Sequence, residues 1–179
     1  MGCGKSSVGR KLSELLCCPF MDLDDEIVAR EGRSISEIFA ADGEGEFRRI
    51  EKETLSDIIA TYGREPQILA LGGGAVMTEG SEEMVHERTL CIYLKASVDT
   101  LIEHLTGETD GRPMLSQSAG SQTAMSSEAE TSPLRKRILE LMSKRAATYE
   151  RTAHITIETD GKSIDEIANE IIKLKHTIL

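Results

Sequence analysis

The sequence predicts an α/β domain with a mainly parallel sheet flanked by helices. Segments with helical periodicity alternate with short apolar runs along the chain of 179 residues, which is the pattern of such domains. The runs at 67–71 and 90–94 are almost continuously apolar, as expected of strands that helices cover on both faces. This length suits one hydrophobic core, so we expect a single domain over residues 1–179.

Each element is predicted from its own local pattern. Residues 5–16 follow a glycine-rich turn and repeat apolar residues at helical spacing, and residues 19–22 form a short apolar run. The same helical spacing predicts helices over 24–31, 44–61, 81–88, 97–105, 134–149 and 163–173. Strands are predicted at 19–22, 67–71, 90–94 and 154–157, because these apolar runs are too short to be buried helices.

The charge and the cysteines limit the classes of partner. Lys and Arg number 21 against 31 Asp and Glu, which gives a formal net charge of −10. Such a surface repels nucleic acid and anionic membranes, so neither is expected as a partner. Four cysteines without metal-binding spacing indicate a reduced protein. With no apolar run long enough to span a membrane and no signal peptide before the first motif, we expect a cytoplasmic protein.

The amino-terminal sequence carries the second half of a phosphate-binding loop, G-x-G-K-[ST]. Its residues are Gly2, Cys3, Gly4, Lys5, Ser6 and Ser7. Glycines let backbone N–H groups curve around phosphate oxygens, and the dipole of the following helix favours anions. In this pattern Lys5 can reach the β- and γ-phosphates and Ser6 can bind Mg²⁺. The alternative is a glycine-rich helix cap without a ligand.

Acids and glycines further along the chain are also candidates for a site. Asp22 and Asp24 follow a short strand, where alternation would point both carboxylates toward the ligand-binding edge of a parallel sheet. As an isolated feature, Asp24 is better explained as the cap of the next helix. The strand at 67–71 is followed by three consecutive glycines, Gly72, Gly73 and Gly74. Their entropic cost makes sense where a ligand ring must lie against bare backbone.

Six motifs together resemble the shikimate kinase family. They are GxGKS, FxDxD, EFR, LGGGA, RPML and RxxxY, in this order from Met1 to about Lys173. Each motif is weak alone, but the order and spacing of all six are specific. The resemblance implies a P-loop fold like that of nucleoside monophosphate kinases. It also implies transfer of the γ-phosphate of ATP to the 3-hydroxyl of shikimate, with Mg²⁺, in aromatic amino-acid biosynthesis.

The resemblance assigns roles to individual residues. Those implied to contact the nucleotide are Gly2, Cys3, Gly4, Lys5, Ser6, Ser7, Arg112 and Lys162. Those implied to contact shikimate are Asp24, Arg48, Gly72, Gly73, Gly74 and Arg145. Ser6 and Asp22 are the implied metal-binding pair. Lys5, Asp24 and Arg112 are implied to be catalytic, because phosphoryl transfer needs positive charge at the γ-phosphate and a base at the attacking hydroxyl.

Two segments are expected to have distinct tasks within the domain. Residues 24–62 would bind the substrate, and residues 107–133 would form a lid over the nucleotide. The lid contains a low-complexity insertion at 116–132, rich in Ser, Ala, Thr and Gln, which is longer than the usual lid of the family. Such a composition buries little apolar surface, so a tolerated surface loop explains the insertion better than a catalytic role.

Several alternatives stay open at this point. Another small-molecule kinase of the same fold, such as a gluconate kinase, would keep GxGKS but not the FxDxD, EFR and triple-glycine combination. A catalytically impaired form is the other alternative, since the first glycine of GxxxxGK[ST] would lie two residues before Met1. The strand that leads into a P-loop is absent as well, so we expect a sheet without its central strand, in a weakly stable monomer.

Overall fold

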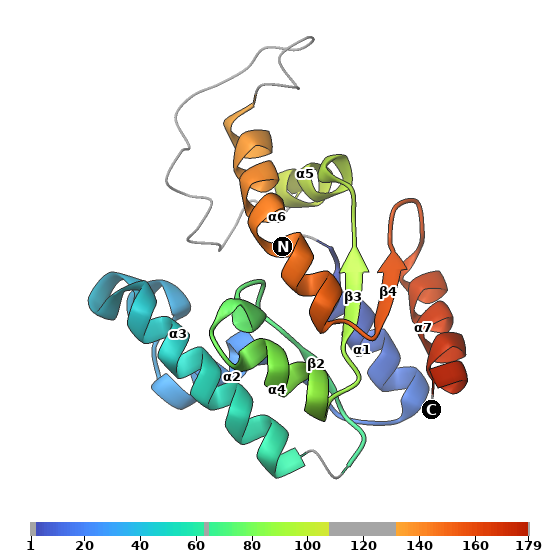
Figure 1. The fold of residues 1–179 in the computed structure, drawn as a ribbon, viewed down its shortest axis with the longest axis horizontal. Coiled ribbons are helices and arrows are strands. Elements are labelled where there is room, and N and C mark those ends of the chain that lie inside the picture. Colours follow the sequence, from blue (N-terminus) through green and yellow to red (C-terminus); the bar gives the residue numbers. More distant parts are fainter. Residues whose placement is uncertain (1–2, 63–64, 108–131, 179) are drawn as a thin grey trace.

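The computed structural model describes residues 3–62, 65–107 and 132–178, which form an α/β fold (Figure 1). Its elements, in chain order, are α1 (Lys5–Leu16), β1 (Phe20–Asp22), α2 (Leu23–Glu31), α3 (Ile35–Tyr62), β2 (Ile68–Ala70), η1 (Ala75–Met77), α4 (Ser81–Arg88), β3 (Ile92–Lys95), α5 (Val98–Gly107), α6 (Pro133–Thr152), β4 (Ile155–Glu158) and α7 (Ile164–Ile178). Every helix and strand predicted from the sequence is present. The predicted α/β class is confirmed.

The strands form two parallel pairs rather than one continuous sheet. β1 pairs with β2 from Phe20 opposite Ile68 to Asp22 opposite Ala70. β3 pairs with β4 from Ile92 opposite Ile155 onward. Among the described residues no strand joins β2 to β3.

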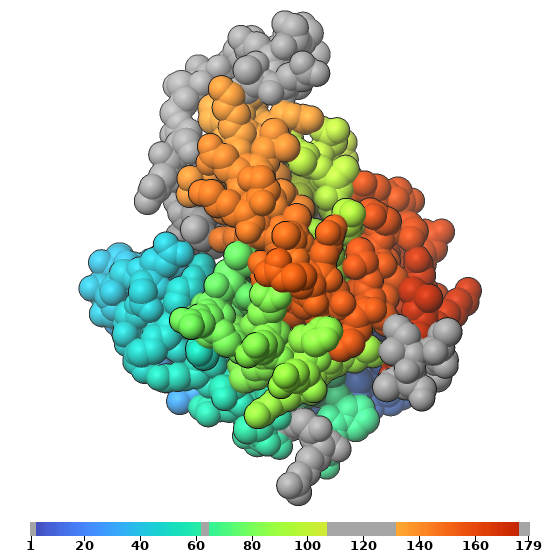
Figure 2. All heavy atoms as spheres, in the orientation of Figure 1, coloured from blue at the N-terminus to red at the C-terminus, as the bar shows by residue number. Residues whose placement is uncertain are grey.

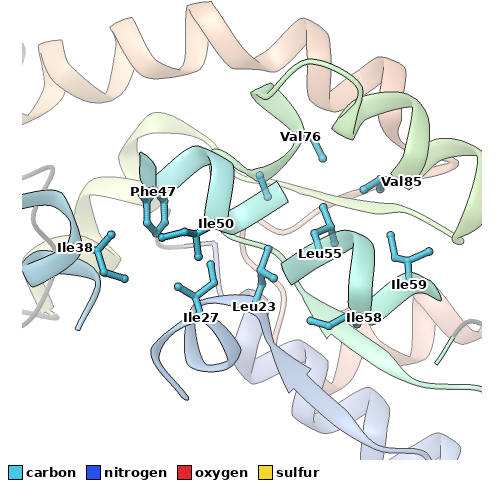
Figure 3. Packing of buried hydrophobic residues seen from close by; sticks show 11 residues of the cluster. Leu23, Ile27, Ile38, Phe47, Ile50, Leu55, Ile58, Ile59, Val76 and Val85 are labelled. Carbon is cyan, nitrogen blue, oxygen red and sulfur yellow. The ribbon is translucent and has the colours of Figure 1, made fainter. Parts of the chain in front are cut away.

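Apolar side chains gather in separate clusters around the two pairs of strands. Side chains of α2, α3, η1 and α4 point toward one another in the largest cluster, which includes Leu23, Ile27 and Leu55 (Figure 3). A second cluster joins α1 and α7 to β3 and β4, with Ile157 fully buried at its centre. The helices α3, α4 and α6 lie on one face of the molecule, where parts of α5 and α7 are visible as well (Figure 2).

One helix is longer than the sequence predicted. α3 begins at Ile35, although helical periodicity predicted a start at 44, and its path bends at Gly43, where φ is 82° and ψ is 174°. The missed signal is a capping box, since the backbone N–H of Ser34 donates to Glu37 at 2.7 Å and Ser34 Oγ accepts from the N–H of Glu37. The bend at Gly43 interrupts the helical repeat of apolar residues, so periodicity did not predict the part of α3 before it.

Candidate active site

The candidate phosphate-binding segment leads directly into α1. Gly4 adopts the left-handed conformation, with φ of 75°, directly before α1. The N–H of Val8 bonds to the carbonyl of Gly4 at 2.9 Å and closes the first turn. The N–H groups of that turn therefore have no partner within the helix, and no acidic side chain lies in it. This helix end can accept a phosphate group.

Ser6 and Asp22 meet at the carboxyl end of β1. The Ser6 hydroxyl donates to Asp22 Oδ2 at 2.7 Å, which ties the start of α1 to the end of the strand. Mg²⁺ takes oxygen ligands, often from one or two side chains together with waters and substrate phosphates. A hydroxyl and a carboxylate in contact beside a helix amino terminus fit that ion, so Ser6 and Asp22 could hold it.

The position of Asp24 corrects one argument made from the sequence. The alternation expected of a strand does not extend to Asp24, because α2 begins at Leu23. The cap of this helix is Asp22, whose Oδ1 accepts from the N–H of Asp24 at 3.1 Å. The interpretation of Asp24 as the cap is therefore also wrong. Asp24 lies in the first turn of α2, where its carboxylate faces the backbone that follows β2.

Glu51 is a site residue that sequence reasoning missed. Its side chain is buried, with 1% of the residue exposed, and a Cβ placed on Gly72 would lie 3.0 Å from both Glu51 Oε1 and Asp24 Oδ1. Burial raises the pKa of the Glu51 carboxyl, whereas the charge of Arg48 and its hydrogen bond lower it. The available signal was the spacing of Glu51 three positions after Arg48 on one helix.

Arg48 is held by Glu51 against the glycine-rich backbone. Its Nη1 donates to Glu51 Oε2 at 2.5 Å, and its Nη2 lies 3.4 Å from Glu44 Oε1. A Cβ on Gly74 would lie only 2.2 Å from Arg48 Nη1. The absence of a side chain at Gly74 therefore makes room for the guanidinium, a packing role that the sequence did not reveal.

Arg145 reaches the same backbone from the other side. Its Nη1 donates to the carbonyl of Gly73 at 3.1 Å, and the hydroxyl of Tyr149, one turn further along α6, also donates to that carbonyl. Burial raises the pKa of the Tyr149 hydroxyl above its ordinary value. The RxxxY motif thus docks α6 onto the glycine triplet through two converging hydrogen bonds.

Arg48 and Arg145 line one cavity of about 310 Å³ between α3 and α6. The other lining residues are Glu44, Met77, Arg137, Glu140, Leu141 and Lys144. Four basic side chains thus face two acidic ones, in a chain whose net charge is −10. The cavity suits an anionic small molecule, and two guanidinium groups can bind a carboxylate in a fixed orientation.

Some predicted site residues are not brought to this cavity. Gly2, Arg112 and most of the expected lid at 107–133 lie outside the described residues. Lys162 follows β4 and forms an ion pair with Glu170, with Nζ and Oε2 2.6 Å apart. Cys3 packs against two of the apolar clusters. Lys5 is the first residue of α1.

The fold and the site together define a class of protein. A helix amino terminus after a glycine-rich loop, an adjacent hydroxyl–carboxylate pair and a basic small-molecule cavity are the parts of a P-loop small-molecule kinase. Within the described part of the chain, no helix is long and apolar enough to cross a membrane.

Comparisons with known proteins name the family. The family model described as shikimate kinase matches residues 1–175. A shikimate kinase of Dictyoglomus turgidum is 37% identical over 176 residues, which cover 97% of this chain and 91% of the relative. A shikimate kinase of Thermus thermophilus is 36% identical, with 97% and 84% covered. The chain therefore belongs to the shikimate kinase family, as its motifs indicated.

Solved structures agree with this assignment. The shikimate kinase of Acinetobacter baumannii in complex with shikimate superimposes with a TM-score of 0.84 at 30% identity, covering 99% of this chain and 89% of that one. The shikimate kinase of Aquifex aeolicus gives a TM-score of 0.76 at 28% identity, with 100% and 94% covered. The predicted P-loop kinase fold is thus confirmed.

Proposed function

We propose that this chain transfers the γ-phosphate of ATP to the 3-hydroxyl of shikimate, giving shikimate 3-phosphate and ADP. The observation that supports this most directly is the meeting of Arg48 and Arg145 at one cavity beside the glycine triplet. Two arginines fit the carboxylate of the substrate. Gluconate also carries a carboxylate and is the substrate of the alternative kinase, so it serves as the comparison in the test.

The residues of the site divide the work of phosphoryl transfer. Lys5 and the amino terminus of α1 would bind the phosphates. Ser6 and Asp22 would hold Mg²⁺, which when bound neutralises charge on the phosphates. Asp24 would orient the attacking hydroxyl and accept its proton. The family resemblance adds Arg112 from the lid and Lys162 near adenine, as further parts of this proposal.

Glu51 completes the arrangement as a positioning residue. Its carboxylate holds the Arg48 guanidinium at 2.5 Å and faces Asp24 across Gly72. We infer that Glu51 keeps Arg48 extended along the glycine backbone before substrate arrives. A rigid clamp loses less side-chain entropy on binding than a mobile one.

A coupled assay of ADP release tests the proposal, with shikimate and gluconate as alternative acceptors. Turnover with shikimate and none with gluconate is the expected result. Turnover with gluconate would identify a different small-molecule kinase. Bound shikimate without turnover would identify an impaired form. The monomeric state and the cytoplasmic location remain predictions, which sedimentation and cell fractionation can test.

The carboxylate clamp has its own test with a matched control. Arg48→Ala and Arg145→Ala should each weaken shikimate binding by about 2–5 kcal/mol, the usual cost of truncating a buried charge pair. Arg49→Ala removes the neighbouring arginine, which is exposed and pairs with Glu46 and Glu53. That control should bind shikimate normally. Normal binding by either clamp variant would remove that arginine from the proposal.

A further inference from the structure

The cavity between α3 and α6 has an inner and an outer pair of basic side chains. Arg48 and Arg145 are the inner pair, since 18% of the Arg48 side chain is exposed and Arg145 is half-buried and bonded to the carbonyl of Gly73. Arg137 and Lys144 are the outer pair, because they line the same cavity but are exposed. The carboxylate clamp proposed above involves only the inner pair.

The outer pair comes from one face of α6. Arg137, Leu141 and Lys144 follow one another at intervals of four and three positions, which places them on the same side of a helix. Arg145 lies eight positions after Arg137 and thus roughly 12 Å further along the helix axis. A carboxylate bound at Arg145 is therefore about two helical turns from the backbone of Arg137, which lies on the approach to the clamp.

Acidic side chains reduce the positive charge of the cavity without cancelling it. Glu44 lies 3.4 Å from Nη2 of Arg48 and so belongs to the inner part. Glu140 is exposed and is the acidic lining residue on α6, where it faces the two cations of the outer pair. An excess of positive charge thus remains at the cavity of a chain whose net charge is −10. A local field opposite in sign to the rest of the surface draws anions to this place.

We propose that Arg137 and Lys144 steer a small carboxylate anion from solvent to the clamp formed by Arg48 and Arg145; this role rests on the proposed function, which supplies the carboxylate. Charged clefts raise the association rates of oppositely charged ligands by about 10–10³. One unit charge at about 6–10 Å in water changes the local concentration of a monovalent anion about two- to threefold. The outer pair together should therefore contribute about four- to tenfold.

The first measurement is kcat/KM for shikimate at saturating ATP in Arg137→Gln, Lys144→Gln and the double variant. At an ionic strength of roughly 10 mM, the Debye length is about 30 Å. Each single change should then lower kcat/KM about two- to threefold, and the double change about four- to tenfold. At about 0.5 M salt, screening should remove most of the difference. The value of kcat should stay unchanged, because steering acts before the substrate is bound.

Two control variants separate a local effect from an effect of total charge. Lys136→Gln removes a positive charge from the same helix, but Lys136 is exposed and does not line the cavity, so kcat/KM should fall by at most about 1.5-fold. Glu140→Gln removes the opposing charge and should raise kcat/KM about twofold at low salt. An equal decline for Lys136→Gln and Arg137→Gln would overturn the proposal, and so would a fall in kcat in the outer-pair variants.

A second measurement does not depend on catalysis. Paramagnetic relaxation of the amides of Leu141 and Arg145 is compared between a carboxylate nitroxide and an ammonium nitroxide of similar size. The anionic probe should relax these amides more strongly in the unmodified chain, and the difference should shrink in the double variant. Equal relaxation by the two probes in the unmodified chain would overturn the proposal. Absence of turnover with shikimate would count against the proposed function alone, because the probes would still show whether the outer pair attracts carboxylates.

Discussion

Replacing Gly74 by alanine should displace Arg48 without removing any charge. The Cβ of an alanine at this position would lie 2.2 Å from Arg48 Nη1 and 2.5 Å from its Cζ. The backbone itself accepts alanine, because φ is −107° and ψ is −12°. Gly74→Ala is therefore a steric test of the clamp, with the backbone conformation unchanged.

The size of the effect follows from the distance that the guanidinium must move. Ordinary van der Waals contact requires a retreat of about 1 Å, and a misplacement of that size can reduce activity about 100-fold. Arg48 can relax into the cavity that it lines, so the loss of stability should be limited to about 1–2 kcal/mol from the weakened bond to Glu51. We expect KM for shikimate to rise about 10- to 100-fold, or about 1.4–2.7 kcal/mol.

Steady-state kinetics with each substrate varied in turn measure this effect. KM for ATP should stay within about twofold of the unmodified chain, because Arg48 is expected to contact shikimate alone. Gly45→Ala is the control, since a Cβ there meets nothing within 4 Å and alanine favours a helix by about 0.5–1 kcal/mol. If both variants kept an unchanged KM for shikimate, the placement of Arg48 against Gly74 would be irrelevant to binding.

Three further outcomes are expected. Asp24→Asn should lower turnover by about 10²–10⁴ while nucleotide affinity is retained, and wild-type turnover would exclude Asp24 as the base. Burial raises the pKa of Glu51 above its ordinary 4.5, so the free energy of unfolding should fall as pH rises through that raised pKa. In denaturation curves at pH 4–8, Glu51→Gln should remove this dependence. An equal decline in the unmodified chain and in the variant would contradict the assignment to Glu51. Burial raises the pKa of Cys91 to about 11, so iodoacetamide should alkylate it at least about tenfold more slowly than exposed Cys17, and equal rates by mass spectrometry would refute this.

Local patterns were sufficient for most elements and for the family. The helix at Lys5–Leu16 and the helix at Ser81–Arg88 have the bounds that periodicity predicted, because an amphipathic face and its end signals lie within neighbouring residues. The P-loop fragment and the ordered motifs predicted the class of enzyme in the same way. The first part of α3 was missed because Gly43 divides its pattern, although the capping box at Ser34 was visible.

Contacts between distant segments required the tertiary structure. Arg145 and Gly73 are 72 positions apart, and the pairing of Glu51 with Arg48 beneath Gly72 depends on how α3 packs against the turn after β2. Period-two alternation misplaced Asp24, since Asp22 caps a helix that begins one residue later.

By itself, therefore, the sequence determined the elements, their order and the chemical groups available, because these depend on neighbouring residues and on composition. Only the tertiary structure decided which groups meet. It placed two arginines on one cavity and buried a carboxylate behind one of them. Such contacts depend on packing and hydrogen bonding between segments far apart in the chain, which leave no periodic signal in any one of them.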